Sequence, residues 1–336
     1  MDKAVPRPWA PRRCSHGPPG STDARRAEGT CGGPGQRTSE TVRKGSSHKK
    51  SERAGKTIEL FLVNGTADSI ITAELSNWNG KAIKIPRIEV QSCNREDITQ
   101  AGVYFLFCKE DDESDSVYIG ESENVKERLL QHIRDYQADK EKYYWTTAVI
   151  FTGRDLNKTL IRYLENRLVE TAKNCKRYKI LTKNTYANTV MKESDHAVME
   201  EFIDDIKVVI NALGYKVLEP LLQKKNGNDS SDDLLYISTG AAKAEGKTTT
   251  EGFVLLQGAV INEKMNARSV NAGIVKLREK CVEEEKIKDL VTTEDLLFSS
   301  SSAAAGFVLG YSVSGPRTWK DKKGKSLKEI ETEKSE

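Results

Sequence analysis

Five side chains between residues 100 and 170 are of the types that could carry out phosphodiester hydrolysis. Tyr104 and Tyr118 lie in two successive apolar runs. Arg128 and His132 follow one helical turn apart, and Glu165 lies in a later helical pattern. The reaction needs a deprotonated water, a cation to stabilise charge on the phosphoryl oxygens, and help for the leaving oxygen. A free phenol has a pKa near 10, so a tyrosine base needs a nearby cation. Arg128 is the cation that this sequence supplies.

An α+β layer is expected to position these side chains. Apolar, β-rich runs predict strands at 102–109, 116–121 and 146–152, with an acidic hairpin loop at 110–115. Helical periodicity predicts helices at 124–137 and 157–174. A hairpin between the first two strands would bring both phenols toward one end of a small sheet.

The two predicted helices place the remaining groups. In the first, Val125, Leu129 and Ile133 form the expected buried stripe. Arg128 borders this stripe and His132 follows one turn later, so both can face the edge of the sheet.

The second helix is expected to bury four residues and to keep Glu165 at the rim. The expected buried residues are Ile161, Leu164, Leu168 and Ala172. A carboxylate at the rim can hold one Mg²⁺ or Mn²⁺, with water completing the shell.

The joint pattern resembles the GIY-YIG endonuclease family over residues 97 to 190. The resemblance is carried by Gly102-Val103-Tyr104, Tyr118-Ile119-Gly120, Arg128, His132 and Leu164-Glu165-Asn166-Arg167-Leu168. It implies a divalent-metal-dependent DNA endonuclease with a central three-stranded antiparallel sheet flanked by helices.

The resemblance also implies roles for individual residues. Tyr104 or Tyr118 acts as or orients the general base, Arg128 stabilises the transition state, and Glu165 binds the single metal ion. A downstream asparagine completes the site, for which Asn184 is the first candidate and Asn188 the second.

Two positions depart from the family pattern. Glu121 follows the second glycine, where a lysine or a small residue is frequent, and Lys179 follows Arg177-Tyr178, where excision-repair members carry the asparagine. A carboxylate at 121, near the phosphate, can repel DNA or tune the metal. The alternative prediction is therefore a DNA-binding or repair-associated module that keeps the fold with reduced or lost catalysis. A third hypothesis, ranked last, is a scaffold for other factors; protein partners are not specified by the sequence.

The C-terminal part resembles a small domain of unknown function that often follows GIY-YIG cores, and it predicts a second α+β unit. The resemblance rests on 252–258, 298–310 and 315–327. Within it, Ser301 or Ser302 would cap a short helix that ends at Leu309 and Gly310.

Candidate nucleic-acid contacts lie in both parts of the chain. Lys126 is the candidate on the first helix of the nuclease core. In the C-terminal part, an aromatic residue lies among lysines, a combination suited to backbone contact and base stacking. These candidates are Trp319, Lys320, Lys322, Lys323 and Lys325. A solvated lysine loop beside a core tryptophan is the alternative interpretation.

The remaining segments predict the domain organisation. Residues 1–56 hold six of the nine prolines and a net charge of 13 − 5 = +8, which predicts a disordered basic tail that serves as a linker or as a basic arm. Residues 57–96 predict two strands and then a bridge at 81–95, in which Pro86 breaks any helix. Further predictions are a packing helix at 191–222, a linker at 223–233, the second domain at 234–330 and a frayed end at 331–336.

Composition excludes some classes of protein. No stretch approaches the roughly 18 apolar residues that cross a bilayer, and the N-terminus lacks an apolar secretory region. The six scattered cysteines fit a reducing compartment. A cytoplasmic protein that contacts no membrane is therefore expected, and the family resemblance implies DNA as its partner.

Overall fold

The computed structural model describes residues 55–109, 115–183, 185, 190–222, 234–266 and 268–335. The predicted tail up to residue 54, the hairpin tip 110–114, the linker 223–233 and both candidate asparagines, Asn184 and Asn188, lie outside the described residues.

The N-terminal part is built on one seven-stranded sheet with the order β1-β2-β3-β6-β4-β5-β7. The strands are β1 (Ile58–Leu62), β2 (Ile71–Leu75), β3 (Gly80–Pro86), β4 (Gly102–Lys109), β5 (Asp115–Ser122), β6 (Trp145–Gly153) and β7 (Lys179–Ile180). All neighbouring pairs are antiparallel except β5 with β7. The predicted strands at 102–109, 116–121 and 146–152 are therefore present, in the central order β6-β4-β5.

The predicted bridge after residue 80 is wrong in its first part. Gly80–Pro86 forms β3, which pairs along its whole length with β6 and also with β2. Pro86 ends this strand, where a missing N–H is tolerated. The strands β1, β2 and β3 therefore extend the sheet that contains β6, β4 and β5.

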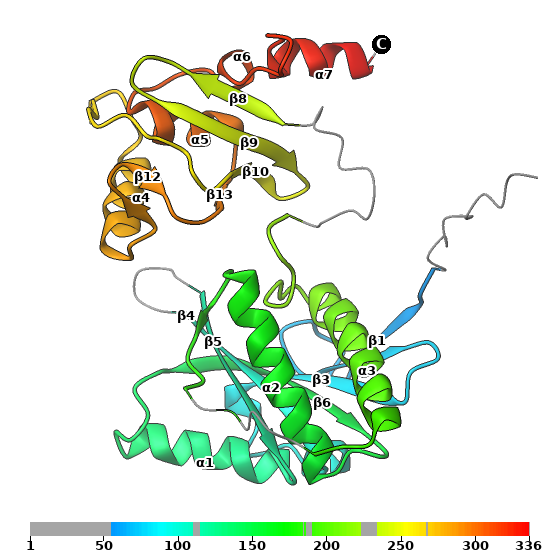
Figure 1. The fold of residues 1–336 in the computed structure, drawn as a ribbon. Coiled ribbons are helices and arrows are strands. Elements are labelled where there is room, and N and C mark those ends of the chain that lie inside the picture. The colour runs from blue at the N-terminus through cyan, green and yellow to red at the C-terminus, as the bar shows by residue number, and fades with distance from the viewer. Residues whose placement is uncertain are drawn as a thin grey trace, which may run out of the picture. The chain divides into compact units, whose positions relative to one another are not determined.

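Helices cover both faces of this sheet, as Figure 1 shows. They are α1 (Val125–Gln137), α2 (Lys158–Cys175) and α3 (Glu193–Ala212), with short 3₁₀ turns η1 (Arg87–Glu89) and η2 (Glu96–Thr99). The helices α2 and α3 pack with one set of alternating strand residues, including Phe105, Ile119 and Phe151. The helix α1 packs with the other set, which includes Tyr104 and Leu106. Because successive strand residues face opposite sides, α1 lies across the sheet from α2 and α3.

Local sequence explains where the two central helices begin. The side chain of Asn124 accepts a hydrogen bond from the backbone N–H of Glu127 and caps α1. Asn157 caps α2 in the same way, accepting from Thr159 and Leu160. Asparagine is among the best N-cap residues because its carbonyl satisfies N–H groups that have no helical partner.

The stripes predicted for these helices are mostly correct. All four residues expected inside on α2 are buried, and on α1 Val125 and Leu129 are buried. On α1, however, His132 is fully buried whereas Ile133 is only half-buried. On α3, Val198 faces solvent, and the buried residues are Met199, Phe202, Ile203, Ile206, Val209 and Ile210.

The C-terminal part is a second α+β unit with its own core. A four-stranded antiparallel sheet has the order β13-β10-β9-β8. The strands are β8 (Leu235–Ser238), β9 (Lys243–Thr249), β10 (Gly252–Leu255) and β13 (Leu296–Phe298), and a separate pair joins β11 (Ile287–Lys288) to β12 (Val291–Thr292). The helices are α4 (Ala272–Glu283), α5 (Ser301–Leu309), α6 (Gly315–Thr318) and α7 (Leu327–Ser335).

The helix α5 begins one residue earlier than predicted. Ser300, and neither Ser301 nor Ser302, is the N-cap, because its hydroxyl accepts from the N–H of Ala303. The predicted end is confirmed, with Gly310 in the left-handed region at φ 78°. The α+β fold class, with an N-terminal β extension and a second α+β unit, is thus confirmed.

Candidate active site

The β4–β5 hairpin brings the two tyrosines together. Tyr104 pairs with Gly120 and Leu106 pairs with Tyr118, so the two phenols are diagonal neighbours on one face of the sheet. Their ring centroids are 6.2 Å apart. Tyr104 is 1% exposed, whereas Tyr118 is half-buried.

Gly120 leaves the room in which the Tyr104 hydroxyl lies. A Cβ atom at position 120 would lie 2.4 Å from the Tyr104 oxygen and 2.9 Å from Cε1 of Tyr118. Contacts this short do not occur in real structures, so any side chain at this position would displace a phenol. The glycine that follows Tyr118-Ile119 is therefore needed for the position of both rings.

Arg128, from α1, interacts with both phenols. Burial acts against the charged guanidinium, but the neighbouring hydroxyls of Tyr104 and Tyr118 raise the pKa of Arg128 above its usual value. Burial raises the pKa of both tyrosines, and the charge of Arg128 opposes that rise. The expected pairing of a phenol with a cation is present, and both phenols are protonated at neutral pH in the free protein.

His132 lies one turn further along α1 and contacts Tyr104. Its Nε2 atom lies 2.9 Å from the Tyr104 oxygen. Burial and the positive charge of Arg128 lower the pKa of His132 to about 3. The imidazole is therefore neutral at neutral pH and has one nitrogen available to accept a proton.

Glu165 reaches the same place from α2, on the other face of the sheet. It interacts electrostatically with Arg128 and with both tyrosines. The predicted rim position is wrong in degree, because Glu165 is only 6% exposed. Burial, together with the negative charge of Glu121, raises the pKa of Glu165 to about 7.

The surroundings of Glu165 fit a divalent cation. Glu165 is a buried carboxylate beside a second negative charge, and Lys158, Arg128 and Arg162 are its nearby cations. Carboxylate oxygen is a donor that Mg²⁺ and Mn²⁺ prefer. The described segments contain no cluster of three or more His, Cys, Asp or Glu side chains that could form a complete metal site. Among the described residues, Glu165 is the side chain that would hold such a cation.

Glu121, expected to repel a phosphate, has its own counter-ion. Both carboxylate oxygens accept hydrogen bonds from Nζ of Lys158, at 2.9 and 2.8 Å, and Nε of Arg162 lies 3.8 Å away. The two cations, from the first turns of α2, offset the charge of Glu121. This pairing weakens the argument from sequence that Glu121 impairs catalysis.

The sheet edge beside Gly120 is closed by a side chain and not by a strand. The strand β7 pairs only with Ser116 and Val117 of β5. Beyond it, the hydroxyl of Thr182 accepts from the N–H of Ile119 at 2.8 Å and donates to the Ile119 carbonyl at 2.7 Å. Because the strand ends here, α1 and α2 can bring Arg128 and Glu165 together around this edge.

Sequence reasoning missed several residues near the site. Two of them are Glu141, which contacts His132, and Tyr143, which hydrogen-bonds to Glu141. The other two are Lys158 and Arg162, which offset the charge of Glu121. Glu141 and Tyr143 precede β6 in a stretch without periodicity, so no pattern pointed to them. Lys158 and Arg162 lie one helical turn apart in α2, and this spacing is the sequence feature that could have pointed to them.

The candidate nucleic-acid contacts are not equally exposed. Trp319 is 0% exposed and its Nε1 donates to the Ser301 carbonyl, so the prediction that it stacks on bases is wrong. Its ring packs 4.5 Å from that of Phe253, because the C-terminal core needs a large apolar side chain there. Lys126 is half-buried and donates to the Cys93 carbonyl. Lys320, Lys322, Lys323 and Lys325 are exposed, and Lys325 pairs with Glu333. The alternative interpretation, a lysine loop beside a core tryptophan, describes this segment.

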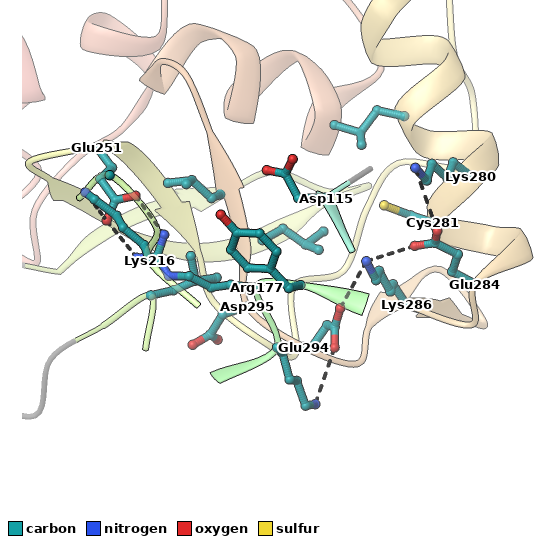
Figure 2. Close-up of a pocket in the computed structure, with 17 residues that line it drawn as sticks. Asp115, Arg177, Lys216, Glu251, Lys280, Cys281, Glu284, Lys286, Glu294 and Asp295 are labelled. Carbon is teal, nitrogen blue, oxygen red and sulfur yellow. Dashed lines mark hydrogen bonds and ion pairs between the residues drawn. The ribbon is translucent and has the colours of Figure 1, made fainter. Parts of the chain in front are cut away.

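A separate cavity of about 460 Å³, drawn in Figure 2, contains none of these catalytic candidates. Its charged side chains are largely paired, for example Arg177 with Glu251 at 2.7 Å and Lys286 with Glu284 at 2.8 Å. Five cationic and five anionic residues line it, so its charge favours no class of ligand.

A match to a known domain implies a nuclease-type fold for the N-terminal part. Residues 100–179 match the GIY-YIG catalytic domain, and residues 235–331 match a domain of unknown function (DUF4357), so the chain carries both domains in this order. Comparison with curated proteins and with solved structures found no match. No helix in the described part of the chain has the length and apolar character needed to cross a membrane.

Proposed function

We propose that this protein is a divalent-metal-dependent endonuclease that hydrolyses phosphodiester bonds of DNA inside the cell. The observation that carries the proposal is the convergence of Tyr104, Tyr118, Arg128 and Glu165 from elements on both faces of the sheet. Packing alone does not require a buried carboxylate and a half-buried guanidinium beside two phenols, because a charge is costly to bury.

Tyr104 is the proposed general base, because a proton acceptor lies beside its hydroxyl. His132 Nε2 is 2.9 Å from that oxygen. As the Tyr104 oxygen takes a proton from the attacking water, its own O–H bond breaks and an N–H bond forms on Nε2 of His132, so no free tyrosinate is formed. The hydroxyl meets Arg128, which is half-buried, so the base lies at the boundary between core and accessible surface.

Arg128 and Tyr118 are proposed to contact the phosphate. Both are half-buried and therefore reachable, and a guanidinium stabilises the charge that develops on phosphoryl oxygens. Glu165 would hold one Mg²⁺ or Mn²⁺, which supplies a further positive charge at the phosphate. Lys158 and Arg162 add cationic groups beside Glu121, at the start of α2.

A nicking assay tests this proposal. Supercoiled plasmid and a panel of branched and single-stranded DNA would be incubated with the full chain and Mg²⁺ or Mn²⁺. Arg128→Ala and Glu165→Gln are expected to lose cleavage by about 10²-fold or more. Arg154→Ala and Glu123→Gln, which change exposed side chains of the same domain, are the matched controls.

The alternative function, DNA binding without turnover, predicts a different result. It requires retained DNA binding by the wild-type chain with no metal-dependent cleavage of any substrate in the panel. Cleavage that survives in both Arg128→Ala and Glu165→Gln would contradict the proposed roles of these residues.

A further inference from the structure

His132 has a second partner to which the proposed reaction assigns no role. Its Nδ1 atom lies 2.7 Å from Oε1 and 2.9 Å from Oε2 of Glu141. Glu141 lies in the segment between α1 and β6, so the contact joins the helix to a separate part of the chain. With Tyr104 on Nε2, the three side chains form a continuous line of hydrogen bonds.

We infer that Glu141 is a positioning residue that keeps the proton of His132 on Nδ1, so that Nε2 is free to take the proton of Tyr104. This inference rests on the proposed function. It assigns to a segment without any sequence signature the task of setting the direction of proton transfer.

The chemistry of the three groups fixes this direction. A neutral imidazole carries one N–H, and an ionised carboxylate can only accept a hydrogen bond. The N–H must therefore be on Nδ1, facing Glu141. The lone pair of Nε2 then accepts from the Tyr104 hydroxyl at 2.9 Å. With the opposite tautomer, Nε2–H would donate to Tyr104, and His132 could not act as its proton acceptor.

The carboxylate also has a task after proton transfer. When Tyr104 loses its proton, His132 becomes an imidazolium inside a fully buried site. A charge in such a place is costly unless an opposite charge lies in contact with it. Glu141 lies within 3 Å of Nδ1 and supplies that charge.

Neighbouring groups hold Glu141 in place and act on its charge. Burial and the negative charge of Asp135 raise the pKa of Glu141. A hydrogen bond from Tyr143 and the positive charges of Arg128 and Arg87 lower it. Arg87 is itself packed 4.7 Å from the Tyr144 ring and 4.8 Å from the Trp145 ring. The side chain of Tyr143 stacks on Tyr118, at 5.7 Å between ring centroids. Packing thus ties the carboxylate to both tyrosines of the site.

The test uses the full chain with Glu141→Leu, which removes both oxygens and keeps the volume, and Glu141→Asp, which restores a carboxylate. Glu127→Leu, an exposed residue of α1, is the control. Long-range ¹⁵N–¹H correlation spectra report the tautomer of each of the four histidines, with His132 assigned from its absence in His132→Asn. The expected result is the Nδ1–H tautomer in wild type and Glu141→Asp, and its loss in Glu141→Leu.

Nicking kinetics supply the second readout. Glu141→Leu is expected to lower kcat by about 10²-fold or more with little change in KM, by analogy with other enzymes in which a carboxylate sets a histidine tautomer. Glu141→Asp is expected to recover part of kcat. An unchanged His132 tautomer in a folded Glu141→Leu protein, or kcat within threefold of wild type, would overturn the inference.

The two readouts separate this inference from the proposed function. If the wild-type chain cleaves no DNA, the proposed function fails, while the tautomer in the metal-free protein still reports on Glu141. If wild type cleaves DNA and Glu141→Leu cleaves it equally well, the function stands and the role of Glu141 is refuted.

Discussion

Replacing Gly120 by alanine adds a single methyl group at the most constrained point of the site. The new Cβ would lie 2.4 Å from the Tyr104 oxygen, 2.6 Å from Cζ of Tyr104 and 2.9 Å from Cε1 of Tyr118. Ordinary contact begins at 3.4 Å, so the Tyr104 oxygen must withdraw by 3.4 − 2.4 = 1.0 Å. The backbone at 120 is paired within β5 with Tyr104 of β4, which limits how far it can move instead.

This displacement is enough to break the contact with His132. The Tyr104 oxygen and Nε2 are 2.9 Å apart, so a shift of 1.0 Å away would leave about 3.9 Å, beyond hydrogen-bond range. A shift toward Nε2 is blocked by contact between the atoms. A misplacement of about 1 Å in a catalytic group costs on the order of 10²-fold in rate. The expected loss of stability is about 1–3 kcal/mol, as for other overpacked cores.

Single-turnover nicking of supercoiled plasmid with Mn²⁺ measures the rate, and urea unfolding measures the stability. Gly240→Ala is the matched control, because a Cβ there meets nothing within 4 Å. A folded Gly120→Ala protein that nicks DNA within threefold of the wild-type rate would refute the argument that Gly120 sets the position of Tyr104.

Four further measurements test the roles of Glu165, Thr182 and Trp319. Because the pKa of Glu165 is raised to about 7, its ionised fraction falls from about 0.9 at pH 8 to about 0.1 at pH 6. Calorimetry should therefore find roughly tenfold weaker Mn²⁺ binding at pH 6 than at pH 8, and no binding in Glu165→Gln. In the metal-free protein, the pKa of Glu165 in the folded state lies above its value in the unfolded state, so Glu165 stabilises the fold at low pH and this contribution is lost as pH rises through 7. Glu165→Gln should therefore remove this part of the pH dependence of thermal unfolding. An unchanged pH dependence in the variant would contradict the reasoning. Thr182→Val removes two hydrogen bonds to Ile119 and should lower the free energy of unfolding by about 1–3 kcal/mol; a change under about 0.5 kcal/mol would show that the edge of β5 does not depend on it. Trp319→Ala should lower the free energy of unfolding by about 3–5 kcal/mol, and stability equal to that of wild type would contradict the place of Trp319 in the core. The double variant Lys322→Ala with Lys323→Ala should leave unfolding unchanged. If these lysines contact DNA, the double variant reduces the salt dependence of DNA binding.

Sequence alone determined the parts of this protein that depend on local pattern. Alternating and apolar runs located the three central strands, and helical periodicity located α1 and α2. The order of Tyr104, Tyr118, Arg128 and Glu165 identified the GIY-YIG domain, because a site assembled from successive elements leaves a fixed spacing along the chain. The C-terminal domain was identified in the same way from its glycine and serine runs.

The tertiary structure decided what depends on contacts between distant segments. Gly80–Pro86 was expected to be a bridge, since Pro86 signals a break, but pairing with β6 makes it a strand. The burial of Trp319 and the pairing of Glu121 with Lys158 both depend on a second element that spacing does not reveal. Glu141 is the clearest case. Its segment has no periodicity, and only the return of the chain from α1 to β6 brings its carboxylate to His132. Hydrophobic periodicity in the sequence predicts which face of a helix or strand is buried. Which residue contacts a buried polar side chain depends on the fold as a whole.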